Sequence, residues 1–248
     1  MDSETKDRLV GALVEARQQR RTLDEQAWSS TVQTPEQAYA VQDGVAARLG
    51  WFTDGPPLHW KTGGSHAPMP PAGARTSPAD YSDTHFNGPG IEAEIALRLG
   101  SPVTPELAAA LTQESATALV DAMAVSIEVV DSRLTDRSRA PALLKLADQQ
   151  THGALAMGAW VPFAARDWAA QQCEIRIGNQ EPVHKTGTCP QGDPTRSLVG
   201  WLRHATRFGT LPAGAVVSTG TWCGVLPAKA GDTVTVTFPG VGSATCRL

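Results

Sequence analysis

Near its start, the chain carries apolar residues at helical spacing. Leucine, valine and alanine side chains recur every three or four positions across residues 3–19, which predicts a first helix. Thr34 followed by a proline is typical of a helix start, and Gln37 is placed to complete a capping box with it. A second helix is therefore predicted from there to Gly50.

The pattern changes after the second helix. Residues 54–90 are rich in Pro, Gly, Ser and Asp and have little apolar periodicity, which predicts one long loop. From Gly90 onward, apolar alternation favours strands. Short helices are predicted after Thr104 and over residues 115–123, the latter leading into a strand at 125–130.

The last third of the chain also reads mainly as strands. A hairpin is predicted around Gly178 and Asn179, because this pair suits a tight turn between two apolar runs. One further helix is predicted from Leu198 to its stop near Gly209, followed by short strands at 215–219, 233–238 and 243–248. The predicted class is therefore α+β, with a helical N-terminal region and a strand-rich remainder.

Composition narrows the choice of function. The 248 residues are 41% hydrophobic, enough for a sizeable core, and 21 basic residues against 25 acidic ones leave no basic field for nucleic acid or an anionic membrane. The four cysteines form no C-x-x-C pair, which argues against a disulfide framework or a thiolate zinc site. Because there is also no apolar leader or membrane-spanning run, we expect a cytoplasmic protein.

Two glutamates lie two residues apart in a predicted strand. Glu92 and Glu94 would share one face, because successive side chains of a strand point to opposite faces, and Glu128 lies within a second apolar run. An isolated pair of this kind is usually a solvated face. Three carboxylates inside core-like runs need a compensating charge, and an oxygen-only ligand set favours Mg²⁺ or Mn²⁺.

Several ordered segments resemble the fumarylacetoacetate hydrolase superfamily. They are residues 90–96 (GIEAEIA), 127–133 (IEVVDSR), 218–221 (STGT) and 229–234 (KAGDTV), and they look most like the branch of 2-keto-4-pentenoate hydratase and 4-oxalocrotonate decarboxylase. The resemblance implies an N-terminal helical and loop region over residues 1–75. A twisted, mixed β-roll over residues 76–248 would then carry the metal-binding catalytic site.

In this family two glutamates and one later acidic residue hold magnesium or manganese. Mapped onto this chain, the ligands are Glu92, Glu94 and Glu128, with Asp131 as the competing third ligand. Glu128 is favoured because it lies mid-strand, where a bare carboxylate is hardest to explain without a cation. Asp131 lies at the strand end, where Arg133 or a turn could satisfy it.

A lysine and a glycine turn complete the implied site. The resemblance makes Lys61 the catalytic residue, and we expect burial beside Trp60 to disfavour its charged form. His59 and His66 are weaker candidates on the same loop. The turn Thr219, Gly220 and Thr221 is the implied substrate-binding segment.

The implied activity is addition of water to a 2-hydroxydienoate or 2-oxo-enoate by a metal-dependent hydratase, as in the breakdown of aromatic compounds. A 2-oxo acid decarboxylase, an acylpyruvate-type C–C hydrolase and a non-catalytic metal-binding relative are the alternatives. The residues after Lys61, in the segment 62–90, depart from the family pattern, so the reaction stays open. The substrate is expected to be a small 2-oxo acid and the protein a homodimer or larger homo-oligomer.

Overall fold

The computed structural model describes residues 1–71 and 73–248; residue 72, within the predicted long loop, lies outside the described residues. The α-helices are α1 (Ser3–Gln19), α2 (Pro35–Arg48), α3 (Pro105–Ala110), α4 (Gln113–Thr117), α5 (Ala142–Ala147) and α6 (Leu198–Ala205). The 3₁₀ turns are η1 (Glu25–Trp28), η2 (Gln149–Thr151), η3 (Pro190–Gly192), η4 (Pro194–Ser197) and η5 (Thr206–Phe208).

The strands form two sheets. The larger sheet has nine strands in the order β2-β1-β11-β5-β6-β7-β3, with β12 added to β5 and β8 to β6. Its members are β1 (His59–Thr62), β2 (His66–Pro68), β3 (Ala74–Thr76), β5 (Gly90–Leu99), β6 (Val120–Val130), β7 (His152–Met157), β8 (Val161–Pro162), β11 (Val216–Ser218) and β12 (Leu226–Pro227). The smaller sheet has five strands in the order β10-β9-β13-β14-β4: β4 (Ala79–Asp80), β9 (Gln172–Ile177), β10 (Val183–Thr186), β13 (Thr233–Phe238) and β14 (Gly242–Arg247).

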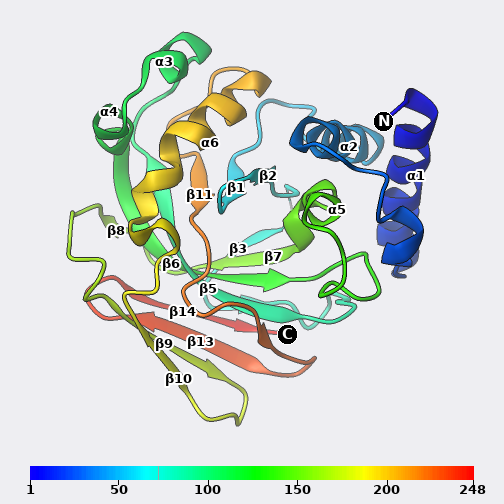
Figure 1. Cartoon of the computed structure of the whole chain (residues 1–248). Coiled ribbons are helices and arrows are strands. Elements are labelled where there is room, and N and C mark those ends of the chain that lie inside the picture. Colours follow the sequence, from blue (N-terminus) through cyan, green and yellow to red (C-terminus); the bar gives the residue numbers. More distant parts are fainter. Residues whose placement is uncertain (72) are drawn as a thin grey trace.

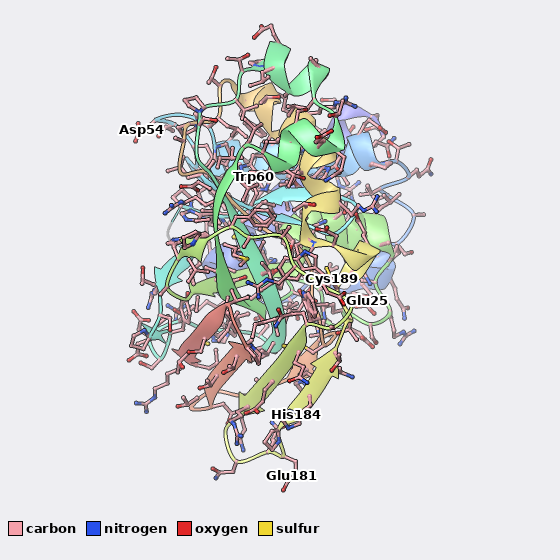
Figure 2. The ribbon with its side chains drawn as sticks, turned by 90° about the vertical axis from the view of Figure 1, so that its left-hand side faces the viewer. Glu25, Asp54, Trp60, Glu181, His184 and Cys189 are labelled. Carbon is pink, nitrogen blue, oxygen red and sulfur yellow. The ribbon has the colours of Figure 1, made fainter. Side chains whose placement is uncertain are left out.

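The two sheets lie one over the other, with the helices at the rim (Figure 1). Apolar side chains of β5, β6, β9, β13 and β14 pack into one large buried cluster that also receives Trp201 and Leu202 of α6. At the other end of the molecule, the hairpin β9–β10 projects away from the body, with Glu181 and His184 near its tip (Figure 2). The predicted α+β class is confirmed.

The N-terminal helices pack at one side of the larger sheet (Figure 1). Leu9 and Leu13 of α1 are fully buried in a second apolar cluster shared with α2 and α5. Thr34 caps α2 as predicted and accepts a hydrogen bond from Gln37 N (3.3 Å). The predicted capping box does not form, because the side chain of Gln37 reaches one residue further back and accepts from Gln33 N (2.8 Å).

Two local predictions are wrong. The stretch predicted as one long loop, residues 54–90, contains the short strands β1 to β4. Strands this short lack enough residues to show a period, and they are held by pairing with distant strands such as β11 and β7. The helix predicted over residues 115–123 ends at Thr117, because residues from Val120 onward pair with β5.

In the part of the chain that the structure describes, none of the helices combines the length and the apolar character needed to cross a bilayer.

Candidate metal centre

Three carboxylates meet on one face of the central strand pair. Strands β5 and β6 run antiparallel in a register that sets Glu92 directly opposite Glu128, with Glu94 two pairs further along and opposite Ser126. One oxygen from each of the three lies within 4.8 Å of the others. Glu94 and Glu128 are almost fully buried, at 1% and 0% exposure, and Glu92 is partly buried. Like charges directly opposite one another destabilise a sheet, so this arrangement calls for a compensating cation.

The electrostatics of the cluster fit a divalent cation. Burial raises the pKa of Glu92 to about 7 and that of Glu94 to about 8, and the neighbouring carboxylates add to both effects. Oxygen Oε2 of Glu128 is buried and has no hydrogen-bond partner among the described residues. Because an unpartnered carboxylate oxygen in a ring of acidic groups is costly, these residues suit a hard cation with oxygen ligands.

Lys61 is the cationic group of the cluster. Its Nζ donates a hydrogen bond to Glu128 Oε1 and another to the carbonyl of Gln150 (3.1 Å). Burial works to lower the pKa of Lys61, but the three carboxylates, Glu128 first, raise it above its ordinary value. This direction is opposite to the expectation from burial alone. Trp60 faces the other side of β1, because neighbouring strand residues point to opposite faces, and its ring packs against that of Phe208.

A histidine that the sequence reasoning missed also touches the cluster. His152 is 1% exposed, and its Nδ1 lies 3.1 Å from Glu128 Oε1. Burial lowers the pKa of His152, so the neutral ring with hydrogen on Nδ1 donates to the carboxylate. The sequence feature that could have pointed to His152 is its place at the start of an apolar run, directly before Gly153. The position of this strand beside β6 could not be derived from it.

The turn before His152 has an unusual backbone. Gln149, Gln150 and Thr151 all adopt positive φ angles, of 48°, 52° and 58°. Residues other than glycine rarely adopt this backbone conformation, and each one that does costs about 1–2 kcal/mol. The turn aims the Gln150 carbonyl at Lys61 Nζ, so strained backbone and the lysine of the site are directly linked.

The glycine turn after β11 supports one carboxylate. Ser218 Oγ and Gly220 N (3.1 Å) both donate hydrogen bonds to Glu94 Oε2. Gly220 has a φ of 97°, which favours glycine. The flanking hydroxyls have partners of their own: Thr219 donates to the carbonyl of Ile95 (2.7 Å), and Thr221 donates to the carbonyl of Gly224 (2.9 Å).

Asp131 lies outside the three-carboxylate cluster. Its Oδ1 accepts hydrogen bonds from the backbone N–H groups of Asn87 (2.8 Å) and Gly88 (3.1 Å), so it anchors the loop before β5. Arg133 lies beside it as expected, with Nη1 4.0 Å from Asp131 Oδ2, and makes a shorter contact with buried Asp148, whose Oδ1 accepts from Nε at 2.6 Å. Both residues therefore have local partners that account for their position.

The structure brings neither His59 nor His66 to a carboxylate. His66 Nδ1 lies 2.8 Å from Thr62 Oγ1, and the ring packs against that of His204. His59 begins β1 on the same face as Lys61, and among residues 1–71 and 73–248 it forms no ion pair. Burial lowers the pKa of His59 and brings that of His66 to about 4.

Comparison with known proteins places these motifs in a family. A family model described as the fumarylacetoacetate (FAA) hydrolase C-terminal domain matches residues 52–248. A 2-hydroxyhexa-2,4-dienoate hydratase from Comamonas testosteroni is 28% identical over 163 residues, which are 64% of this chain and 59% of that protein. The match therefore spans less than two thirds of the relative's length.

Solved structures share the fold. A 4-oxalocrotonate decarboxylase from Pseudomonas putida G7, complexed with magnesium and adipate, superposes with a TM-score of 0.81 at 20% identity, covering 100% of this chain and 98% of that one. A fumarylpyruvate hydrolase from Pseudomonas aeruginosa, in complex with Mn²⁺ and pyruvate, gives 0.50 at 16% identity, covering 73% of this chain and 77% of that one. At these identities the similarity establishes the fold alone.

Proposed function

Because the chain belongs to the fumarylacetoacetate hydrolase family, as its motifs predicted, we propose that it is a metal-dependent hydratase. The reaction is addition of water to a 2-hydroxydienoate or 2-oxo-enoate. The observation that carries the proposal is the buried cluster of Glu92, Glu94 and Glu128 with Lys61 hydrogen-bonded to Glu128. The hydratase from Comamonas testosteroni supports the choice of reaction within the family.

Glu92, Glu94 and Glu128 are the proposed ligands of Mg²⁺ or Mn²⁺, and solved relatives with magnesium, calcium or Mn²⁺ support a divalent ion. When bound, the ion supplies Lewis-acid stabilisation of negative charge on the oxygens of a 2-oxo acid. Ser218 and Gly220 hold Glu94 in place, and His152 holds Glu128.

Lys61 is the proposed proton-transfer residue. Because the neighbouring carboxylates raise its pKa, the resting lysine is protonated and starts the reaction as a donor. Its hydrogen bonds to Glu128 and to the carbonyl of Gln150 fix Nζ beside the carboxylates, where a carbon of the acid would receive the proton. Addition of water across the double bond needs this proton at carbon and a hydroxyl at the other end.

The remaining candidates keep lesser proposed roles. The turn Thr219, Gly220 and Thr221 is proposed to line the substrate, although Gly220 N and both hydroxyls already have protein partners. His59 stays a candidate because it shares the face of β1 with Lys61. An acylpyruvate-type hydrolase is less favoured, since the family's hydrolases use a histidine–glutamate pair on the N-terminal side, and neither His59 nor His66 contacts a glutamate among the described residues. The histidine that contacts Glu128 is His152, on β7.

Ultraviolet absorbance tests the proposal. Wild-type protein with 2-hydroxypenta-2,4-dienoate should bleach the dienol signal in Mg²⁺, and EDTA should stop the reaction. Product analysis separates the alternatives: released carbon dioxide from 4-oxalocrotonate would identify a decarboxylase, and pyruvate from an acylpyruvate would identify a hydrolase. If no acid in this set is converted with any divalent ion, the protein is a non-catalytic family member.

We further propose that the chain works in the cytoplasm as a homodimer or larger homo-oligomer, in the breakdown of aromatic compounds. The near-balanced charge and the family resemblance support this setting. Light scattering on the purified chain, with a subunit mass of 26.2 kDa, tests the assembly.

A further inference from the structure

A small basic hollow lies between the end of α1 and the loop before β5, apart from the carboxylate cluster. Three arginines line it: Arg17 and Arg20 from the end of α1, and Arg133 from the segment after β6. Its volume is about 140 Å³. At about 30 Å³ for each water, this is room for about four to five water molecules. Gly153, directly after His152, also lines the hollow, which therefore adjoins the strand that brings His152 to the cluster.

Two of these guanidinium groups share one carboxylate. Nε of Arg133 and Nη2 of Arg17 lie 2.6 and 3.4 Å from the same oxygen, Asp148 Oδ1. Arg133 has further partners, because it also donates to the backbone carbonyls of His152 (2.9 Å) and Asp148 (3.1 Å). Arg17 is held more loosely. Its other hydrogen bond, to Gln149 Oε1, is 3.3 Å long, and its Nε is buried without a partner among residues 1–71 and 73–248.

The remaining charged groups leave the hollow positive. Asp131 lines it, but this carboxylate already accepts from two backbone N–H groups of the loop before β5 and lies 4.0 Å from Arg133. Arg20 is exposed and forms no ion pair in the part of the chain that the structure describes. Three arginines against Asp131 and Asp148 leave one positive charge uncompensated. Burial, and then repulsion by Arg133, lowers the pKa of Arg17 to about 9, the direction expected of a cation with incomplete compensation.

We infer that this hollow binds a phosphoryl group, as inorganic phosphate or as part of a small phosphorylated metabolite, through Arg17 and Arg20. Guanidinium and phosphate groups form charge-assisted, often bidentate hydrogen bonds, and arginines that converge from separate positions suit an anion with several oxygens. Arg20 and His85 are exposed at the rim, so the remainder of a larger ligand can stay in solvent. The inference does not depend on which reaction the metal centre performs.

A ligand in the hollow would act on the strained turn. Arg17 contacts Asp148, directly before the turn, and Gln149, its first residue. The next residue, Gln150, presents its carbonyl to Lys61. A phosphoryl group would offset the repulsion between the two adjacent guanidinium groups, so that Arg17 keeps its contacts with the turn. Occupancy of the hollow should therefore stabilise the backbone that holds Lys61.

Calorimetry with inorganic phosphate in EDTA tests the site. EDTA keeps divalent ions away from the carboxylate cluster, so phosphate cannot bind there through a metal. The wild type should bind phosphate with a dissociation constant of about 1 mM or less. Arg20→Gln, which leaves the buried contacts of Arg17 in place, should weaken binding at least about tenfold, and Arg17→Gln should weaken it further.

Arg21→Gln is the matched control. Arg21 is the neighbouring exposed arginine and is paired with Glu15 at 2.8 Å, and its replacement changes the net charge as much as Arg20→Gln does. Its phosphate affinity should equal that of the wild type. The melting temperatures of Arg20→Gln and Arg21→Gln without phosphate should match the wild-type value, which shows that the fold is intact.

Hydrogen exchange tests the link to the turn. Phosphate should slow exchange of the backbone amides at residues 148–153 in the wild type and in Arg21→Gln, and not in Arg20→Gln. Binding with slowed exchange elsewhere but unchanged exchange at these residues would overturn the link.

The site itself is overturned by either of two results. One is a dissociation constant above about 10 mM in the wild type. The other is an equal loss of affinity in Arg20→Gln and Arg21→Gln, which would show an adventitious ion only. A parallel titration with glycerol 3-phosphate assigns the source of the phosphoryl group: tighter binding than inorganic phosphate supports a phosphorylated metabolite, and weaker binding supports free phosphate.

Discussion

Replacing Glu94 with glutamine should make the metal-free protein more stable than the wild type. In the presence of the metal ion, the variant should be no more stable than the wild type. Glu94 is 1% exposed and lies beside Glu92 and Glu128, so its ionised form is strongly disfavoured in the folded state. Glutamine has nearly the same shape, and its carbonyl oxygen can still accept the hydrogen bonds from Ser218 Oγ and Gly220 N. The substitution therefore removes mainly the charge.

The size of the effect follows from the pKa of Glu94, which burial and the neighbouring carboxylates raise from 4.5 to about 8. A carboxyl whose pKa is higher in the folded state destabilises the fold increasingly as pH rises from 4.5 to 8, because the unfolded chain releases its proton first. At pH 7 the raised pKa of Glu94 lowers the free energy of unfolding by about 3 kcal/mol. Glu94→Gln should thus raise the free energy of unfolding in EDTA by about 2–3 kcal/mol at pH 7.

The cation should remove this advantage. At a concentration 100 times its dissociation constant, a bound ion adds about 2.7 kcal/mol to the free energy of unfolding of the wild type. If loss of Glu94 weakens binding by about 100-fold, the same concentration adds only about 0.4 kcal/mol to the variant. A gain in stability that is present in EDTA and lost in the ion is expected only of a ligand, and not of a carboxylate with a purely structural role.

Urea unfolding at pH 7, in EDTA and in Mg²⁺, measures both quantities. Glu181→Gln is the control, because Glu181 lies exposed at the tip of the β9–β10 hairpin, far from the cluster (Figure 2). This control should behave as the wild type in both buffers. The reasoning is refuted if Glu94→Gln is less stable than the wild type in EDTA, or if Mg²⁺ stabilises it as much as the wild type.

Three further predictions address other parts of the site and fold. Lys61→Gln should lower the rate constant of dienol conversion by about 10²–10⁴-fold while calorimetry still detects Mn²⁺ binding; an unchanged rate would exclude Lys61 as the proton donor. Burial brings the pKa of His66 to about 4 and that of His204 to about 3, so the unfolded chain takes up these protons first as pH falls from 6.5. Stability should therefore decline toward pH 4, and His204→Gln should reduce that slope by about 1.4 kcal/mol per pH unit; an unchanged slope would contradict the assignment. Asp148→Asn, which breaks the buried pair with Arg133, should cost about 3–5 kcal/mol in urea unfolding, and a loss below about 1 kcal/mol would show that the pair is dispensable.

The carboxylates could be found from the sequence because their evidence is local. The alternation of residues 91–97 shows that Glu92 and Glu94 share a face, and this holds for any strand whatever its neighbours. The register that sets Glu92 opposite Glu128 is a property of strand pairing. The end of β5 and the start of β6 are separated by residues 100–119, which carry no tight-turn signal that would define the register. The family resemblance supplied the set of three ligands and not the register.

Site residues that lie on irregular segments could not be predicted from the sequence in the same way. His152 and Gln150 reach the cluster only because β7 pairs with β6 after a left-handed turn, and no periodicity marks such a turn. Lys61 is held on a four-residue strand that pairs in parallel with β11, more than 150 residues away. The pKa of Lys61 was misjudged for a related reason, since its direction depends on three carboxylates that lie near it only in the folded chain.

The strained turn and the carboxylate cluster together explain why this region needs strong local anchors. Three consecutive left-handed residues, Gln149 to Thr151, cost about 3–6 kcal/mol, and keeping Glu94 protonated in the fold adds about 3 kcal/mol at pH 7. The turn follows Asp148 directly, and Asp148 is fixed by Arg133 through both its side chain and its backbone carbonyl. Because the buried pair immobilises the residue before the turn, the Gln150 carbonyl stays on Lys61 although the backbone that carries it is unfavourable. The buried pair of Arg133 and Asp148 thus stabilises the region next to the site, and it keeps the strained turn in contact with Lys61.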